Sequence, residues 1–125
     1  MMMNILLAVL ATLQAAPAVN PMHAAVQQLT KTARNEERFD AVTALLRARK
    51  IPFTVERFTI EKPLGREPRT EGRNIVATFG SAGKPIVVGA HYDAVRLQDG
   101  TLSHGAADNA GSSVILTTIA ESLMA

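Results

Sequence analysis

Two side chains in the last third of the chain, His91 and Asp93, have types and spacing suited to holding a divalent metal ion. They follow the run IVVGA at residues 86–90, whose β-branched residues and preceding proline predict a short buried strand. Side chains two positions apart leave the same face of a strand, about 6.6 Å apart along the backbone. A neutral imidazole binds metal through one nitrogen, and a carboxylate that accepts the other N–H fixes its orientation. His91 therefore fits a ligand and Asp93 its orienting partner, although a single histidine is more often a core residue.

A third candidate, Asp108, lies in the stretch GAADNAGSSVILTTIAESLM. Gly105 permits a tight turn there, and the apolar periodicity predicts a helix from about Gly111 whose wide apolar surface packs against a sheet. Asp108 is thus near a helix start, where the helix dipole and free N–H groups favour a carboxylate. An ordinary N-cap and a metal-site residue are both open interpretations. His104, in the polar loop at residues 94–104, is interpreted as a loop histidine rather than a ligand.

The remaining pattern predicts the elements that would position these residues. Asn20 and Pro21 indicate a helix start, and this first helix is expected to end near Arg34. The segments that follow are predicted as a helix (36–50), a strand near an edge (53–60), a loop (61–73), a second strand (74–79) and a hairpin-like connection (80–84) to the strand at 86–90. The last two strands are expected to be antiparallel neighbours. The charged residues of the second helix, Arg38 among them, are expected to lie mostly on its solvated face.

Composition limits the class of protein. The 125 residues allow one domain, and a formal net charge of +2, with basic residues scattered among acidic ones, gives no nucleic-acid binding stripe. The absence of cysteine excludes disulfides and thiolate metal sites. The oligomeric state is left open by the sequence.

The N-terminus has the features of a signal peptide. Residues 4–12 are mostly apolar but too short to span a bilayer, and Ala16-Pro17-Ala18 provides a cleavage site. We expect residues 1–18 to be removed and the mature protein to be exported, either to a periplasm or to the outside, with no membrane attachment. A buried or disordered N-terminal helix is the alternative.

An apolar strand that ends in His91-Tyr92-Asp93, followed by G-A-x-D-N at a helix start, resembles metallopeptidase family 28. This family contains zinc aminopeptidases of the secreted leucyl type and the animal glutaminyl cyclases. The resemblance runs from the second helix to Ala125 and implies an α/β fold with a mixed sheet flanked by helices. Residues 19–125 would be the N-terminal half of such a domain, truncated after about three strands.

The resemblance also assigns roles to the candidate residues. It implies that His91 binds one zinc ion, that Asp93 orients it as a catalytic residue, and that Asp108 bridges two zinc ions. A cis peptide is expected between Asp108 and Asn109. This chain has Ala110-Gly111-Ser112 where the family usually has A-S-G or G-S-G, an exchange of small residues. The family's Glu-Glu pair, later aspartate and later histidine would all lie beyond Ala125.

The function implied by the resemblance is that of a metallo-aminopeptidase, which removes N-terminal residues from peptides with a water activated by two zinc ions. With two of the five ligands present, this chain is expected to be an incomplete and inactive fragment. A glutaminyl cyclase-like acyltransferase and a non-catalytic module of the same fold are the alternatives.

Overall fold

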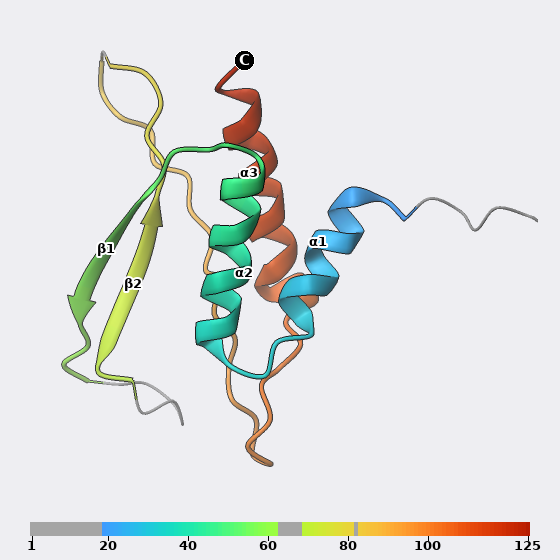
Figure 1. The fold of residues 1–125 in the computed structure, drawn as a ribbon. Helices are drawn as coiled ribbons and strands as arrows, with labels where there is room; N and C mark the ends of the chain where they lie inside the picture. The colour runs from blue at the N-terminus through green and yellow to red at the C-terminus, as the bar shows by residue number, and fades with distance from the viewer. Residues whose placement is uncertain (1–18, 63–68, 82) are drawn as a thin grey trace, which may run out of the picture.

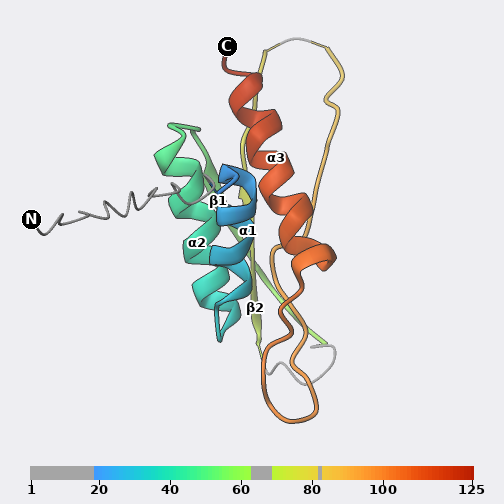
Figure 2. The ribbon, with the colours of Figure 1, turned by 90° about the vertical axis from the view of Figure 1, so that its right-hand side faces the viewer.

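The computed structural model describes residues 19–62, 69–81 and 83–125, so the predicted signal peptide lies outside the described residues. Its elements, in chain order, are α1 (Pro21–Thr30), α2 (Asn35–Ala48), β1 (Thr54–Thr59), β2 (Glu71–Val76), the π-helical turn η1 (Ala106–Ala110) and α3 (Gly111–Ser122). The three α-helices pack on one another, and β1 and β2 form an antiparallel pair beside α2 (Figures 1 and 2). Ile75 of β2 packs against the core, and the guanidinium of Arg73 of β2 lies over the ring of Phe39 of α2. Within the described part of the chain, no helix has the length and apolar character needed to cross a membrane.

The first two helices begin where the sequence predicts them. The side chain of Asn20 caps α1 by accepting a hydrogen bond from the Met22 N–H at 2.9 Å. The expected end near Arg34 is wrong, because α1 stops at Thr30. The Thr32 hydroxyl donates to the Leu29 carbonyl at 2.7 Å, and Glu37 accepts from the Ala33 N–H at 2.8 Å. These side-chain hydrogen bonds give the backbone partners that replace another helical turn.

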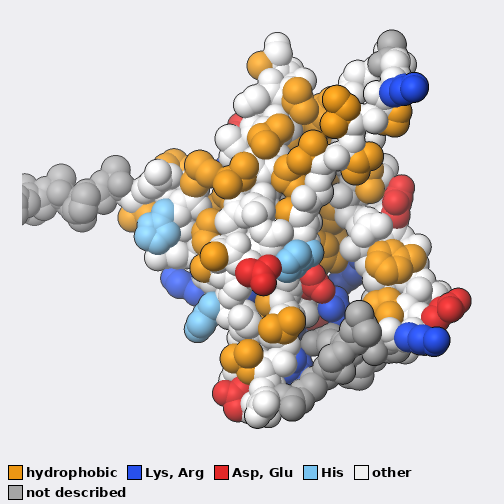
Figure 3. Space-filling model, turned by 180° about the vertical axis from the view of Figure 1, so that it is seen from behind, with side chains coloured by type: hydrophobic (Ala, Val, Ile, Leu, Met, Phe, Trp, Pro, Cys, Tyr) orange, Lys and Arg blue, Asp and Glu red, His pale blue; other side chains and the backbone are white. Residues whose placement is uncertain are grey.

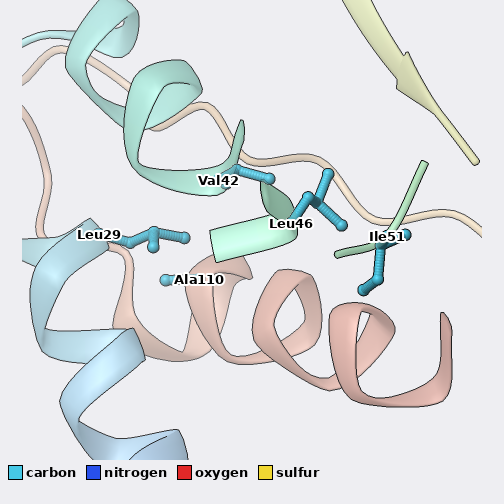
Figure 4. Packing of buried hydrophobic residues seen from close by; sticks show 5 residues of the cluster. All are labelled: Leu29, Val42, Leu46, Ile51 and Ala110. Atoms are coloured by element: carbon cyan, nitrogen blue, oxygen red, sulfur yellow. The ribbon is translucent and has the colours of Figure 1, made fainter. Parts of the chain in front are cut away.

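The core lies between the helices. Figure 4 shows its central side chains, contributed by α1, α2, the segment after α2 and the end of η1: Leu29, Val42, Leu46, Ile51 and Ala110. Burial of one large aliphatic side chain stabilises the fold by roughly 1.5–3 kcal/mol. The same core face of α2 also carries buried polar residues, Asn35, Arg38 and Thr43. The expectation of a solvated Arg38 is therefore wrong, since backbone carbonyls of a distant loop receive its guanidinium.

The sheet has two antiparallel strands in the described residues, paired from Thr54 opposite Val76 to Thr59 opposite Glu71. The predicted first strand is confirmed, and its edge character is clear because all six residues of β1 are exposed. The second strand is confirmed in kind but begins and ends three residues earlier than expected. The described chain is thus a small α/β assembly of packed helices and an antiparallel pair.

The third predicted strand, at residues 86–90, is not formed, and neither is its antiparallel pairing with the preceding strand. Ile86, Val87 and Val88 are 91%, 89% and 64% exposed. Residues 84–90 form no backbone hydrogen bond with another described residue. Gly80 and Gly83 have positive φ values of 77° and 92°, and the described residues that follow do not pair with β2. β-branched residues favour an extended backbone, but a strand also needs a neighbour to pair with.

Candidate metal centre

The structure brings the three candidate site residues together at the start of α3. Nε2 of His91 lies 2.9 Å from Oδ1 of Asp108. On the other side of the ring, Nδ1 lies 3.1 Å from the Asp93 carbonyl oxygen and 3.4 Å from Oδ1 of the same residue. Both ring nitrogens of His91 therefore face acceptors. Asp93 stands behind the ring as expected, although its backbone carbonyl is the nearer of its two contacts.

Asp108 does not act as a helix cap. It lies within η1 with non-helical φ and ψ of −119° and 86°, and the residue at the N-cap of α3 is Ala110, without a side-chain hydrogen bond. The peptide bond between Asp108 and Asn109 is cis, which confirms the expectation from the resemblance. The Asp108 side chain is 90% exposed, and the hydrogen-bond partner given by the structure is His91. The N-cap interpretation is thus wrong.

Gly105 sets the path of the backbone into Asp108. Its φ and ψ of 53° and 40° are left-handed. A Cβ added at this position would lie 2.6 Å from the Asp108 carbonyl oxygen and 3.3 Å from Nη1 of Arg38. The Gly105 carbonyl also accepts the Ala110 N–H at 3.0 Å, which closes the turn. The site thus needs glycine here for both conformation and space.

His91 and its neighbour Tyr92 are held from opposite sides of the segment. The hydroxyl of Ser113, a buried residue of α3, donates to the His91 carbonyl at 3.0 Å. The half-buried Tyr92 hydroxyl donates to the Arg73 carbonyl at 3.0 Å, and its ring centre lies 5.9 Å from that of Phe39. Burial raises the pKa of Tyr92. The predicted alternation therefore holds: Tyr92 faces the protein, and His91 faces outward.

Asp93 has a second partner that sequence reasoning missed. Nη2 of Arg69 lies 3.0 Å from Oδ2 of Asp93. This contact occupies one carboxylate oxygen and leaves Oδ1 toward the His91 ring. The two residues are 24 positions apart, and no local pattern in the sequence connects them.

Two buried residues of α2 form hydrogen bonds with the backbone of the loop that follows Asp93, and the sequence did not predict these contacts. The Asn35 side chain accepts from the Ala94 N–H at 2.8 Å and donates to the Ala94 carbonyl at 2.9 Å. Nη2 of Arg38 donates to the Ser103 carbonyl at 3.0 Å and, over a shorter distance, to the His104 carbonyl. A signal for Arg38 did exist, because it stands four residues before Val42 and so lies on the core face of the helix.

The surroundings of His91 favour its protonated form when no metal is bound. Partial burial lowers the pKa of His91, but hydrogen bonds to the Asp93 carbonyl and the Asp108 carboxylate, with the charges of both residues, outweigh it. The resulting pKa is above the ordinary value. A metal ion at Nε2 would have to displace a proton that these acceptors stabilise.

The other histidines lie elsewhere. Nδ1 of His104 is 3.2 Å from the Thr30 carbonyl, and His23 is an exposed residue of α1. The interpretation of His104 as a loop histidine agrees with this contact.

The His91–Asp108 pair fits zinc by donor type and nearly by spacing. Two ligand atoms on one tetrahedral zinc ion, each about 2.0–2.2 Å from it, stand about 3.3 Å apart. The observed separation of Nε2 and Oδ1 is 2.9 Å, so a movement of a few tenths of an ångström would admit an ion. Residues 19–62, 69–81 and 83–125 hold no group of three or more His, Cys, Asp or Glu residues arranged to bind a metal ion. The described chain thus offers two ligands where structural and catalytic zinc sites have three or four.

A protein-family model matches the part of the chain that contains this site. Residues 74–125 match the model of peptidase family M28. This segment belongs to peptidase family M28. The M28 match includes His91, Asp93 and Asp108, the cis peptide and all of α3, and it indicates a peptidase-type hydrolase. No curated protein and no solved structure matches the chain.

Proposed function

We propose that this chain carries the first metal-binding elements of a zinc aminopeptidase of family M28. His91 and Asp108 are the proposed ligands, and Asp93 is the residue that orients His91. The observation that carries the proposal is the 2.9 Å approach of Asp108 Oδ1 to His91 Nε2, with Asp93 at the opposite ring nitrogen. Zinc, when bound, lowers the pKa of a bound water and polarises a substrate carbonyl.

Each residue has a defined task in this proposal. Asp93 holds a proton on Nδ1 of His91, so that the lone pair of Nε2 is available to an ion. Arg69 holds the far oxygen of Asp93 and so keeps its other oxygen toward the ring. Asp108, with a carboxylate that is mostly solvent-exposed, has two oxygens and can serve two ions at once.

Two ligands hold zinc weakly and leave no general base to move the substrate proton. We therefore propose that the 125-residue chain has no peptidase activity alone, and that the remaining ligands and a glutamate base come from residues outside the described set. The proposed substrate is the N-terminal end of a peptide. Export, expected from residues 1–18, is consistent with a secreted peptidase and is part of the proposal.

Calorimetric titration of the 125-residue chain with zinc tests the site directly. We expect weak binding of one ion, lost in both His91→Ala and Asp108→Ala and retained in His104→Ala, a matched histidine outside the pair. Equal zinc affinity in wild type and His91→Ala would refute the assignment of the ligands.

A second measurement tests the reaction. Protein expressed from the complete coding sequence should release the amine from aminoacyl-anilide substrates, and a chelator or Asp108→Ala should abolish this release. A complete protein that binds zinc at His91 and hydrolyses no aminoacyl substrate would contradict the proposed activity while leaving the metal site standing.

A further inference from the structure

We propose that Arg38 is a positioning residue for the metal ligands: its buried guanidinium fixes the backbone that brings Asp108 to His91. The metal part of this inference rests on the proposed function, whereas the conformational part does not. Arg38 lies on α2, far in sequence from either ligand, and touches neither of them through a described hydrogen bond.

The contacts of Arg38 converge on the segment that enters η1. The residue is 0% exposed. A single nitrogen, Nη2, donates to the carbonyls of both Ser103 and His104. The next residue is Gly105, whose left-handed turn leads directly to Asp108. Arg38 therefore determines where the turn begins.

Packing alone does not explain a buried arginine at position 38, because burying a charged guanidinium costs free energy. Among the described residues, its Nε and Nη1 have no hydrogen-bond partner although both atoms are buried. Burial lowers the pKa of Arg38, and the negative charge of Asp93 opposes that effect. An apolar side chain of similar volume would fill the space without burying a charge and would often be no less stabilising. What an apolar residue cannot do is hold two carbonyl groups in place.

Asn35 completes the attachment of the loop to α2. It lies one turn before Arg38 and holds both backbone polar groups of Ala94, directly after Asp93. The loop between Asp93 and Gly105 is thus fixed at both ends to the same face of α2. This arrangement explains how two residues 17 positions apart, His91 and Asp108, reach hydrogen-bond distance.

The first measurement needs no metal: amide hydrogen exchange in the full 125-residue chain. The Ala110 N–H, which donates to the Gly105 carbonyl, reports the turn, and the buried Ile51 N–H, which donates to Leu46, reports the core. In Arg38→Met we expect protection of Ala110 to fall about tenfold or more while Ile51 keeps its protection. The control is Arg47→Met, which removes an exposed arginine of the same helix whose guanidinium contacts the Thr43 hydroxyl and the Phe53 ring and not the loop. This variant should leave the Ala110 amide unchanged.

The second measurement is the dissociation constant for zinc, with the visible absorption spectrum of the cobalt-substituted chain as a readout of ligand geometry. Loss of a group that hydrogen-bonds a metal ligand directly typically weakens metal binding 10–100-fold, and we take that range as a guide for Arg38, which acts through the backbone. We expect a loss in that range for Arg38→Met, a changed cobalt spectrum, and partial recovery in Arg38→Lys, whose ammonium can donate to one of the two carbonyls.

The outcomes separate this inference from the proposed function. Unchanged protection of Ala110 in Arg38→Met, or lost protection with unchanged zinc affinity, would overturn the inference. If wild type binds no zinc while Arg38→Met still loses protection at Ala110, the positioning of Asp108 stands and the proposed function fails. If Arg38→Met has no cooperative unfolding transition, Arg38→Lys decides: reduced protection at Ala110 with Ile51 unchanged supports the inference, and full protection overturns it.

Discussion

Replacement of Gly105 by alanine should disrupt the candidate site from within the backbone. The position has a φ of 53°, and left-handed backbone costs a residue with a Cβ roughly 1–2 kcal/mol. In addition, the new Cβ would lie 2.6 Å from the Asp108 carbonyl oxygen, which forces the turn to move. Overpacking of this kind typically costs about 1–3 kcal/mol. The expected loss for Gly105→Ala is therefore roughly 2–5 kcal/mol in the free energy of unfolding.

Gly100 offers a matched control. It also has a positive φ, 85°, but a Cβ added there would meet no atom within 4 Å. Gly100→Ala should thus show only the conformational cost of about 1–2 kcal/mol. Urea unfolding followed by far-ultraviolet circular dichroism measures both variants, and zinc titration measures the site. Equal stability of the two variants, or an unchanged zinc affinity in Gly105→Ala, would refute the reasoning about the turn.

Three further predictions concern separate contacts. Asn35→Ala leaves the N–H and carbonyl of Ala94 buried without their partners and should lower the free energy of unfolding, measured with urea, by about 2–4 kcal/mol. A loss below about 1 kcal/mol would show that water takes the place of the Asn35 amide. The pKa of His91 is raised in the folded, metal-free protein, so its stabilising contribution is complete below the ordinary value of 6.5 and is lost as pH rises through the folded-state pKa. The stability of the wild type should therefore fall relative to that of His91→Gln over this pH range. Parallel stability curves for the two proteins would contradict this prediction. The exposed pair of Arg57 and Glu71 joins β1 to β2, and Arg57→Ala should change the free energy of unfolding by less than about 1 kcal/mol, with a larger loss showing a structural role for the pair.

The elements that the sequence predicts well are those encoded locally. The cap at Asn20, the proline after it and the apolar spacing of α2 act within one or two helical turns, so α1 and α2 begin where expected. The third strand could not be predicted in the same way. The β-branched run from Ile86 to Val88 favours an extended backbone, but strand pairing is decided by a neighbour that lies elsewhere in the chain.

The same difference between local patterns and distant contacts applies to the candidate site. The spacing within His91-Tyr92-Asp93 predicted that His91 and Asp93 share one face, and the resemblance supplied the approach of Asp108 and the cis peptide. The supports from Arg69 and Asn35 were not predicted because their partners lie 24 and 59 residues away. Arg38 was also placed wrongly, on the solvated face of its helix. Its charge suggested solvent, whereas the carbonyl groups that bind it belong to a loop far away in the sequence.

An exposed apolar surface covers part of α3 and the connecting segment. Figure 3 shows apolar side chains gathered over α3 and beside it. Among the exposed apolar residues are Ile86, Val87 and Val88 of the connecting segment and Ile115, Ile119 and Leu123 at α3 and its end. Surfaces of this kind favour association in solution.

The connection at residues 84–90 separates the chain into two parts that are packed together. Everything before it supplies α1, α2 and both strands, and everything after it supplies the site residues and α3. Yet Leu29 and Val42 of the first part share one core with Ala110 of the second. With no backbone hydrogen bond of its own to the described chain, the connection acts as a tether. The two parts behave like binding partners on one polypeptide, and the tether sets the effective concentration at which they meet.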